Sequence, residues 1–382
     1  MVPFFCYAHK KTQFFRSKKR STRRGHVFYV FVFDPTMPKL IIFPTLAFFF
    51  FVVAAEAQFD FGKGEPDGGR YVGGPRLGES KTQIWRAGII IEAGVVLENV
   101  QITIPVPMEW KEQKILSRNE ERMDAGLASR IEYRPTFSGD AMEMWLQLGS
   151  VRPTSPLEVV VEFELQNFEL LPPENPGEYV IPTRSRVPRE VGQYLTPSPT
   201  IESNNPVFAK MFSEITRDRK TDWDKVEALY SFVQKNVKYD EQAWNKPANG
   251  ALAVTRMPRG EWTGDCKDMS CLFVALCRAG GVPARIVRVP EHCYAEFYLD
   301  LKQESRTRNA RPVGFWFPCQ VSGTYSFGGI PERRVILQKG DSFSEPDNPR
   351  TKKLFLTESF IGERLSGSPY PRPRWVQEAV VK

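Results

Sequence analysis

The residues from Gly264 to Gln320 constrain the fold most, because a helix pattern and several strand patterns follow one another within this stretch. Apolar residues recur at helical spacing after Cys266 until two glycines interrupt them, which predicts a buried helix with Cys266 in its first turn. A short apolar run follows, and apolar and polar residues then alternate over His292 to Leu299 and again over Val313 to Gln320. This order predicts an α+β domain with a helix packed on antiparallel strands.

Cys266 and His292 are the candidate reactive residues of this stretch. A thiol in the first turn of a helix lies close to unpaired N–H groups and the positive end of the helix dipole, which lower its pKa and favour the thiolate. Alternation predicts that His292 and every second residue after it face the helix N-terminus, with Cys293 on the opposite, apolar face. Pairing of the last two strands would bring Gln320 beside His292. Together the three side chains supply a nucleophile, a base and an amide that orients the base.

At these residues the chain resembles the transglutaminase-like superfamily, whose core has a G-x-C helix, a strand opening with H-x-x-x-E and a strand ending W-x-P-x-D. The corresponding segments here are Gly264 to Cys266, His292 to Glu296 and Trp316 to Gln320. The resemblance covers roughly residues 204 to 320 and implies a papain-like core in which Cys266 is the nucleophile and His292 the base. Gln320 stands where the family usually has Asp, so it can accept the ring N–H but carries no charge to stabilise an imidazolium.

The rest of the chain divides by composition. Residues 81–186 hold short runs of β-forming residues separated by Pro, Gly and polar turns, which predicts a β-sandwich-like domain. The proline-rich residues 187–203 are expected to form a stiff linker before a transglutaminase-like domain over residues 204–340. Residues 341–382 are assigned to a C-terminal tail. From Ser366 this tail has too few core-forming side chains to fold alone, so we expect it to lie on the surface or stay mobile.

Two more helices are predicted at the start of the transglutaminase-like domain. A short one covers residues 206–216, and an amphipathic one covers residues 222–237. Thr221 has the position of an N-cap, with Asp224 as the acid three residues later. Residues 332–338 are expected to add one more strand after Gln320.

The first 57 residues determine the charge and the expected location of the chain. Residues 1–36 contain eight Lys or Arg against one acid, a net charge of +7 that equals the charge of the whole chain. The remainder is therefore nearly neutral, which gives no indication of a nucleic-acid partner. From Met37 a basic start, an apolar run and Ala55-Glu56-Ala57 form the pattern of a secretory signal peptide. We expect a non-native extension over residues 1–36, a signal peptide over 37–57, a flexible leader over 58–80, and an exported protein, periplasmic or secreted, without a stable membrane anchor.

Five cysteines follow the predicted cleavage site: Cys266, Cys271, Cys277, Cys293 and Cys319. An odd number in an exported protein leaves at least one thiol free, and Cys266 is the candidate. Cys293 and Cys319 each adjoin a candidate site residue on neighbouring strands. Two interpretations stay open for them, a disulfide between the strands or two buried thiols.

His292 is the one histidine after residue 36, which argues against a zinc site, because catalytic zinc takes three protein ligands in which histidine is prominent. The sequence contains no phosphate loop, dinucleotide fingerprint or EF-hand loop, so no metal and no cofactor is expected. Trp262 and Trp316 are candidate walls of a substrate groove.

These features predict an exported, cysteine-dependent acyl-transfer enzyme that hydrolyses peptide or amide bonds of a cell-envelope protein or peptide through a thioester. The preference for hydrolysis over protein cross-linking rests on the resemblance to bacterial relatives. Two alternatives stay open beside a cross-linking transglutaminase. One is a non-catalytic protein-binding module of the cell envelope, in which Gln320 marks the loss of the triad, and the other is a structural role in the envelope.

Overall fold

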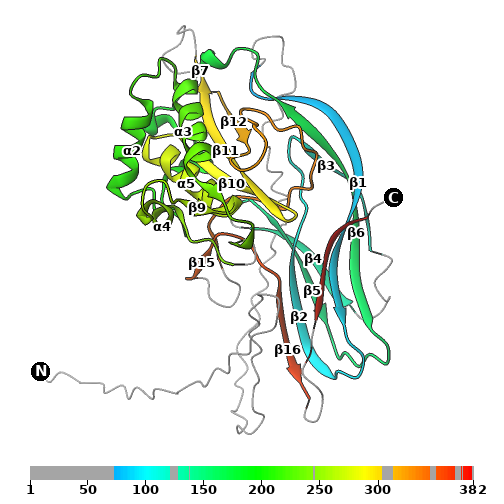
Figure 1. The fold of residues 1–382 in the computed structure, drawn as a ribbon. Coiled ribbons are helices and arrows are strands. Elements are labelled where there is room, and N and C mark those ends of the chain that lie inside the picture. The colour runs from blue at the N-terminus through cyan, green and yellow to red at the C-terminus, as the bar shows by residue number, and fades with distance from the viewer. Residues whose placement is uncertain are drawn as a thin grey trace, which may run out of the picture.

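The computed structural model describes residues 73–120, 128–136, 138–243, 246–302, 313–344, 350–365, 371 and 373–380. The predicted extension, the signal peptide and most of the leader lie outside the described residues. Figure 1 shows two lobes, one built from long strands and one in which helices lie on a smaller sheet. The predicted α+β class, a β-sandwich followed by a helix-covered antiparallel sheet, is confirmed.

The first lobe is a sandwich of two four-stranded antiparallel sheets, in the orders β17-β1-β6-β3 and β16-β2-β5-β4. Its strands are β1 (Arg76–Ile91), β2 (Leu97–Val106), β3 (Gln113–Asn119), β4 (Ala128–Pro135), β5 (Met142–Leu148), β6 (Leu157–Leu171), β16 (Ser359–Arg364) and β17 (Arg374–Val380). Alternate residues of β1, among them Trp85, Ala87 and Ile89, are buried between the sheets. Full burial of each large apolar side chain stabilises the sandwich by roughly 1.5–3 kcal/mol.

The C-terminal residues complete both sheets of the sandwich, although their composition predicted a surface or mobile tail. β16 pairs with β2, and β17 pairs with β1 so that Trp375 lies opposite Ile89. An edge strand is held mainly by backbone hydrogen bonds and by one apolar face, so few core-forming residues suffice for it. The strands β16 and β17 are therefore part of the first lobe.

The segment between the lobes, residues 176–195, overlaps the predicted linker and packs on the second lobe. It contains η1 (Pro176–Glu178), β7 (Tyr179–Val180), η2 (Arg184–Arg186), α1 (Arg189–Gly192) and η3 (Gln193–Leu195). β7 pairs with the end of β11 (His292–Leu301), and the buried Tyr179 ring lies 4.8 Å from that of Phe317. This segment thus adds a short strand to the second lobe.

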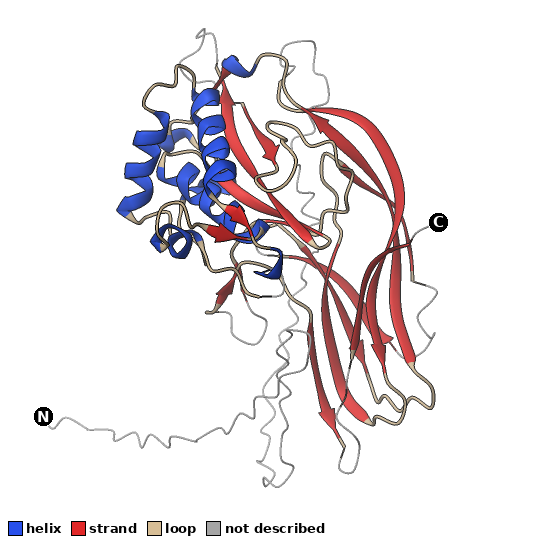
Figure 2. Cartoon of the chain, viewed as in Figure 1, coloured by secondary structure: helices blue, strands red, loops and turns tan. Residues whose placement is uncertain are grey.

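The second lobe is a sheet in the order β12-β11-β10-β13 whose one face is covered by helices, as Figure 2 shows. Its elements are α2 (Pro206–Thr216), α3 (Asp222–Asn236), β8 (Lys238–Tyr239), η4 (Glu241–Ala243), α4 (Ala251–Arg256), β9 (Thr263–Gly264), α5 (Cys266–Ala279), β10 (Ala284–Val289), β12 (Gly314–Cys319) and β13 (Gln338–Lys339). The remaining short strands β14 (Phe343–Ser344) and β15 (Lys352–Lys353) pair with each other. The predicted helices are confirmed, and Thr221 and Asp224 form the expected capping box.

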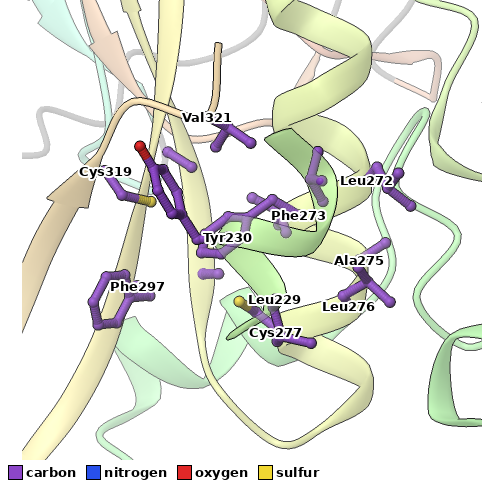
Figure 3. Packing of buried hydrophobic residues seen from close by; sticks show 14 of the residues in the cluster. Leu229, Tyr230, Leu272, Phe273, Ala275, Leu276, Cys277, Phe297, Cys319 and Val321 are labelled. Carbon is purple, nitrogen blue, oxygen red and sulfur yellow. The ribbon is translucent and has the colours of Figure 1, made fainter. Parts of the chain in front are cut away.

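The helices cover the face of β11 that carries Cys293, Ala295 and Phe297. Figure 3 shows Phe297 and Cys319 of the sheet directed toward Tyr230 and Phe273 of the helices. The prediction that every second residue after His292 turns toward the start of α5 is therefore wrong for Tyr294, Glu296 and Tyr298, whereas His292, the first residue of the strand, does contact Cys266. An apolar helix gains most by packing on the apolar face of a strand, and that is the face with Cys293.

The other face of the sheet packs on the sandwich through buried charges. Glu296 of β11 lies 2.8 Å from Arg285 and 2.6 Å from Lys339, and Lys339 also pairs with Glu112 near β3. Residues 335–337 are buried here, although the strand expected over 332–338 is reduced to β13. Among the described residues, none of the helices has the length and apolarity needed to cross a membrane.

Candidate active site

The first turn of α5 is built on a buried cap. Asp265 is the N-cap, and its Oδ1 accepts hydrogen bonds from the backbone N–H groups of Lys267 at 2.9 Å and Asp268 at 3.1 Å. The Lys267 ammonium group forms an ion pair with the Asp265 carboxylate at 2.8 Å. Cys266 follows the cap directly, and its side chain is fully buried.

Asp268 ties this first turn to the loop before α4. Its carboxylate accepts hydrogen bonds from the backbone N–H of Asn249 at 2.7 Å, the Asn249 amide at 2.9 Å and the backbone N–H of Gly250 at 3.2 Å. Asp268 and Lys267 are both buried. Their role is to hold the turn that presents Cys266.

The start of β11 lies against this turn. Cys293 Sγ is 3.9 Å from Ser270 Oγ, and Ser270 is one helical turn after Cys266 on the same face of α5. Glu291 precedes the strand with a φ of 57°, a left-handed conformation that turns the chain sharply into β11. His292 and Cys293 therefore enter the sheet beside the capped end of α5.

Cys266 has a strongly acidic thiol in this setting. A hydrogen bond with the Cys293 thiol lowers its pKa most, burial opposes this, and a hydrogen bond and Coulomb attraction from His292 lower it further, to about 5. Burial raises the pKa of the Cys293 thiol well above its ordinary value, and the neighbouring Cys266 adds to that rise. The structure thus brings Cys266 and His292 into contact, and near pH 7 the Cys266 side chain is a thiolate.

Gln320 follows the end of β12, where Cys319 pairs with Ala295 of β11. Its side chain is 7% exposed, and its amide nitrogen donates to Glu332 Oε1 at 3.2 Å. Its amide oxygen is buried and has no hydrogen-bond partner in the part of the chain that the structure describes. Gln320 is therefore held by Glu332, a residue that no sequence motif singles out.

The two candidate groove tryptophans lie on opposite sides of the sheet. Trp262 precedes α5, donates to the Met257 carbonyl at 3.0 Å and lines a cavity of about 400 Å³ between α2, α3 and the end of α4. Trp316 lies on the face turned away from α5, with the Arg285 guanidinium 4.1 Å from its ring centroid. Trp262 is thus on the side of Cys266, whereas Trp316 packs against Tyr194 and Tyr298 on the other face.

Tyr239 is a further residue beside the thiol that the sequence analysis did not identify. It belongs to the short strand β8, which pairs with β9 so that Tyr239 lies opposite Gly264, two residues before Cys266. Partial burial raises its pKa first, and the charges of Cys266, Asp265 and Cys293 raise it further, to about 12. Its side chain is 44% exposed, so it lies at the surface next to the buried thiol.

The structure also answers whether Cys293 and Cys319 are bonded and whether side chains gather around a metal site. Cys293 and Cys319 are free thiols in the structure, and Cys319 lies opposite Ala295, so the two are not directly opposed on the ladder. Within the described ranges, His, Cys, Asp and Glu side chains do not gather in threes close enough to hold a metal ion. The chemistry available at the capped end of α5 is that of a thiolate beside an imidazole.

The second lobe is similar to known proteins. Residues 209–319 match the model of the transglutaminase-like superfamily. An uncharacterised protein of Haemophilus influenzae is 25% identical over 193 residues, which are 49% of this chain and 48% of that protein, so the chain spans about half the length of this relative. A solved structure from Cytophaga hutchinsonii, named as a candidate cysteine protease, matches with a TM-score of 0.50 and 15% identity over 79% of this chain and 92% of its own. At that identity the likeness shows a shared fold.

Proposed function

We propose, from the premise that the chain contains a transglutaminase-like superfamily domain, that it is a cysteine-dependent hydrolase of peptide or amide bonds. One observation carries the proposal: the Cys266 thiol contacts His292 at the capped start of α5, with its pKa lowered to about 5. Structural thiols in a core have raised pKa values, so a lowered one beside a histidine is the mark of an activated nucleophile.

The proposed reaction runs through a thioester. Cys266 attacks the carbonyl carbon as a thiolate, so His292 serves in this step by donating a proton to the departing amine. A backbone N–H at the start of α5 stabilises the oxyanion. His292 then takes a proton from water, which attacks the thioester carbonyl and frees the thiolate and a carboxylic acid.

The exposure of the surrounding residues indicates the side from which a substrate approaches. Cys266 is fully buried, whereas His292 is partly exposed and Tyr239 is 44% exposed. A peptide carbonyl would therefore reach the thiolate past these two side chains. Trp262 and its cavity lie on the same side of the sheet and are the candidate contacts for the remainder of the substrate.

The experiment that tests this function is a cleavage assay on a mixture of peptides of varied sequence, with new termini detected by mass spectrometry. Cys266→Ala should reduce the cleavage rate by at least roughly 10³-fold. Cys277→Ala, which removes a core thiol from the same helix, is the matched control and should leave the rate unchanged. Equal cleavage by the wild type and Cys266→Ala would refute the proposal.

The same assay separates hydrolysis from cross-linking if a fluorescent primary amine is added. A hydrolase yields free carboxylates, whereas a cross-linking transglutaminase incorporates the amine into the peptide. A protein that cleaves nothing, but still retains envelope peptides on a column, would support the binding-module alternative, which the uncharged Gln320 favours.

We also propose that the protein is exported and acts on an envelope protein or peptide. The support is the signal-peptide pattern over residues 37–57. Expression in a Gram-negative bacterium should yield a periplasmic form whose first residue is Gln58. An exported form that begins upstream of Met37 would contradict the proposed signal peptide.

A further inference from the structure

The surroundings of Gln320 define an orientation of its amide group. The nitrogen donates to Glu332 Oε1 at 3.2 Å, and Arg334 Nε holds the second oxygen of Glu332 at 2.7 Å. An ionised carboxylate only accepts hydrogen bonds, so the nitrogen end of the amide must face Glu332 and the oxygen end must face away. The carboxylate thus decides which end of the Gln320 side chain is presented to the site.

The presented oxygen is an acceptor in need of a donor. It is buried and has no partner in the described part of the chain, a condition that destabilises the folded state. Gln320 directly follows Cys319, which pairs with Ala295 of β11. Because the two strands are antiparallel, the residues of β11 nearest to Gln320 are those from Ala295 toward His292. Alternation puts Gln320 and His292 on the same face of this sheet, so the ring N–H of His292 is the donor that fits.

We propose that Glu332 is a positioning residue of the active site, which through the Gln320 amide holds the imidazole of His292 in the orientation that serves Cys266. This inference rests on the proposed function and explains the departure from the W-x-P-x-D pattern. In this chain two residues, Gln320 and Glu332, do what a single aspartate does in that pattern.

The contact also explains why an aspartate would not serve at position 320 in this chain. A carboxylate there would face the carboxylate of Glu332, acceptor against acceptor and charge against charge. One of the two would have to take up a proton or turn away. Glutamine is the residue type that can donate to Glu332 and accept from His292 at once.

The test is a set of exchanges at the two positions in the full chain, read by kcat, KM and their pH dependence. Gln320→Asp alone should lower kcat by roughly 10–100-fold with little change in KM, because it repels Glu332 and loses the oriented acceptor. The double variant Gln320→Asp with Glu332→Gln should recover kcat to within about threefold, because the new amide donates to the new carboxylate. A purely structural contact would not show this rescue.

Two single exchanges at Glu332 complete the set. Glu332→Ala frees the amide and should lower kcat about tenfold, whereas Glu332→Gln keeps an acceptor oxygen for it and should cost much less. Arg334→Gln is the matched control, since it removes the ion pair of Glu332 and leaves the contact with Gln320. Wild-type kcat and pH profile in Glu332→Ala, or an unaffected Gln320→Asp, would overturn the inference.

A readout without turnover keeps the inference separate from the proposed function. The pH midpoint of Cys266 alkylation by iodoacetamide should rise by about one unit in Glu332→Ala, because a less well held imidazolium stabilises the thiolate less. If the wild type hydrolyses nothing, the hydrolase proposal fails, while a shifted midpoint still supports the link from Glu332 to Cys266. An unshifted midpoint overturns that link.

Discussion

The first turn of α5 and its later turns contain the same residue type in opposite electrostatic states. Cys266 has a pKa lowered to about 5, whereas burial raises the pKa values of Cys271 and Cys277 above their ordinary value. All three side chains are fully buried. The difference therefore comes from the groups around each sulfur. Cys266 has Cys293 and His292 as donors, whereas burial dominates at Cys277 and also at Cys271, where the Thr200 hydroxyl 3.3 Å away only partly offsets it.

The charged side chains at the two ends of α5 also have different roles. At the first turn, Asp265 and Lys267 cap the helix beside a reactive group. At the last turn, Arg278 lies 2.6 Å from Asp341 and donates to the carbonyls of Ala284 and Thr196. The first turn of the helix thus presents the reactive thiol, and the last turn anchors the helix to neighbouring segments.

The largest expected effect concerns the reactivity of Cys266 compared with the other cysteines of α5. At pH 6 the thiolate fraction of Cys266 should exceed that of an ordinary thiol by roughly 10³-fold, partly offset by its lower nucleophilicity. Its alkylation rate should therefore stay flat above about pH 6, while an ordinary thiol gains about tenfold per pH unit. Mass spectrometry of the iodoacetamide-treated native protein measures this, with Cys271 and Cys277 unlabelled until unfolding.

His292→Ala tests the source of this difference. Loss of the imidazole removes one hydrogen bond and the Coulomb attraction, so the alkylation midpoint of Cys266 should move to higher pH. If the alkylation rate of Cys266 in the wild type rose tenfold per pH unit between pH 7 and 9, Cys266 would be an ordinary thiol and would not differ from the other cysteines of α5.

The anchoring end should have the largest effect on stability. Arg278→Met leaves the buried Asp341 carboxylate without its cation and should lower the free energy of unfolding by about 3–5 kcal/mol, measured by urea denaturation. Adding Asp341→Leu should recover part of the loss, because no unpaired charge remains. A single variant that loses less than about 1 kcal/mol would show that Arg278 is no anchor.

The reactive end should make stability depend on pH. The folded pKa of Cys266 is depressed, so its ionisation stabilises the folded state fully above the unfolded pKa near 9, and this contribution is lost as pH falls toward 5. Wild-type stability relative to Cys266→Ala should rise between pH 5 and 9 by a few kcal/mol. Parallel curves for the two proteins would contradict the lowered pKa, and Cys277→Ala should run parallel to the wild type.

Exchanges at Cys293 separate the contributions of the two donors to the pKa of Cys266. Cys293→Ala removes the contact that lowers the pKa of Cys266 most, so the alkylation midpoint should rise by at least about one unit. Cys293→Ser keeps a donor at that position and should shift the midpoint less. Equal midpoints in the wild type and Cys293→Ala would assign the lowering to His292 and the helix start.

Local signals predicted much of the second lobe. The Thr221 cap, the helical spacing after Cys266 and the alternation after His292 each reflect a preference of a few neighbouring residues, and the structure agrees with them. The apolar face of β11 was predicted correctly, but the expectation that Tyr294, Glu296 and Tyr298 face the start of α5 was wrong, because the helix packs on the apolar face. Tyr239 and Glu332 went unnoticed, since each lies in a short or irregular segment that is brought to the site by contacts distant in sequence.

By itself, the sequence determined the α+β class, the helix that presents Cys266, and the approach of His292 through an ordered set of motifs, because these depend on periodicity and on residue type. Only the tertiary structure decided that Cys293 lowers the pKa of the thiol most, that Glu332 holds Gln320, and that the C-terminal strands complete the sandwich. The reason is physical: hydrogen-bond partners, burial and edge pairing arise between segments that no local pattern relates.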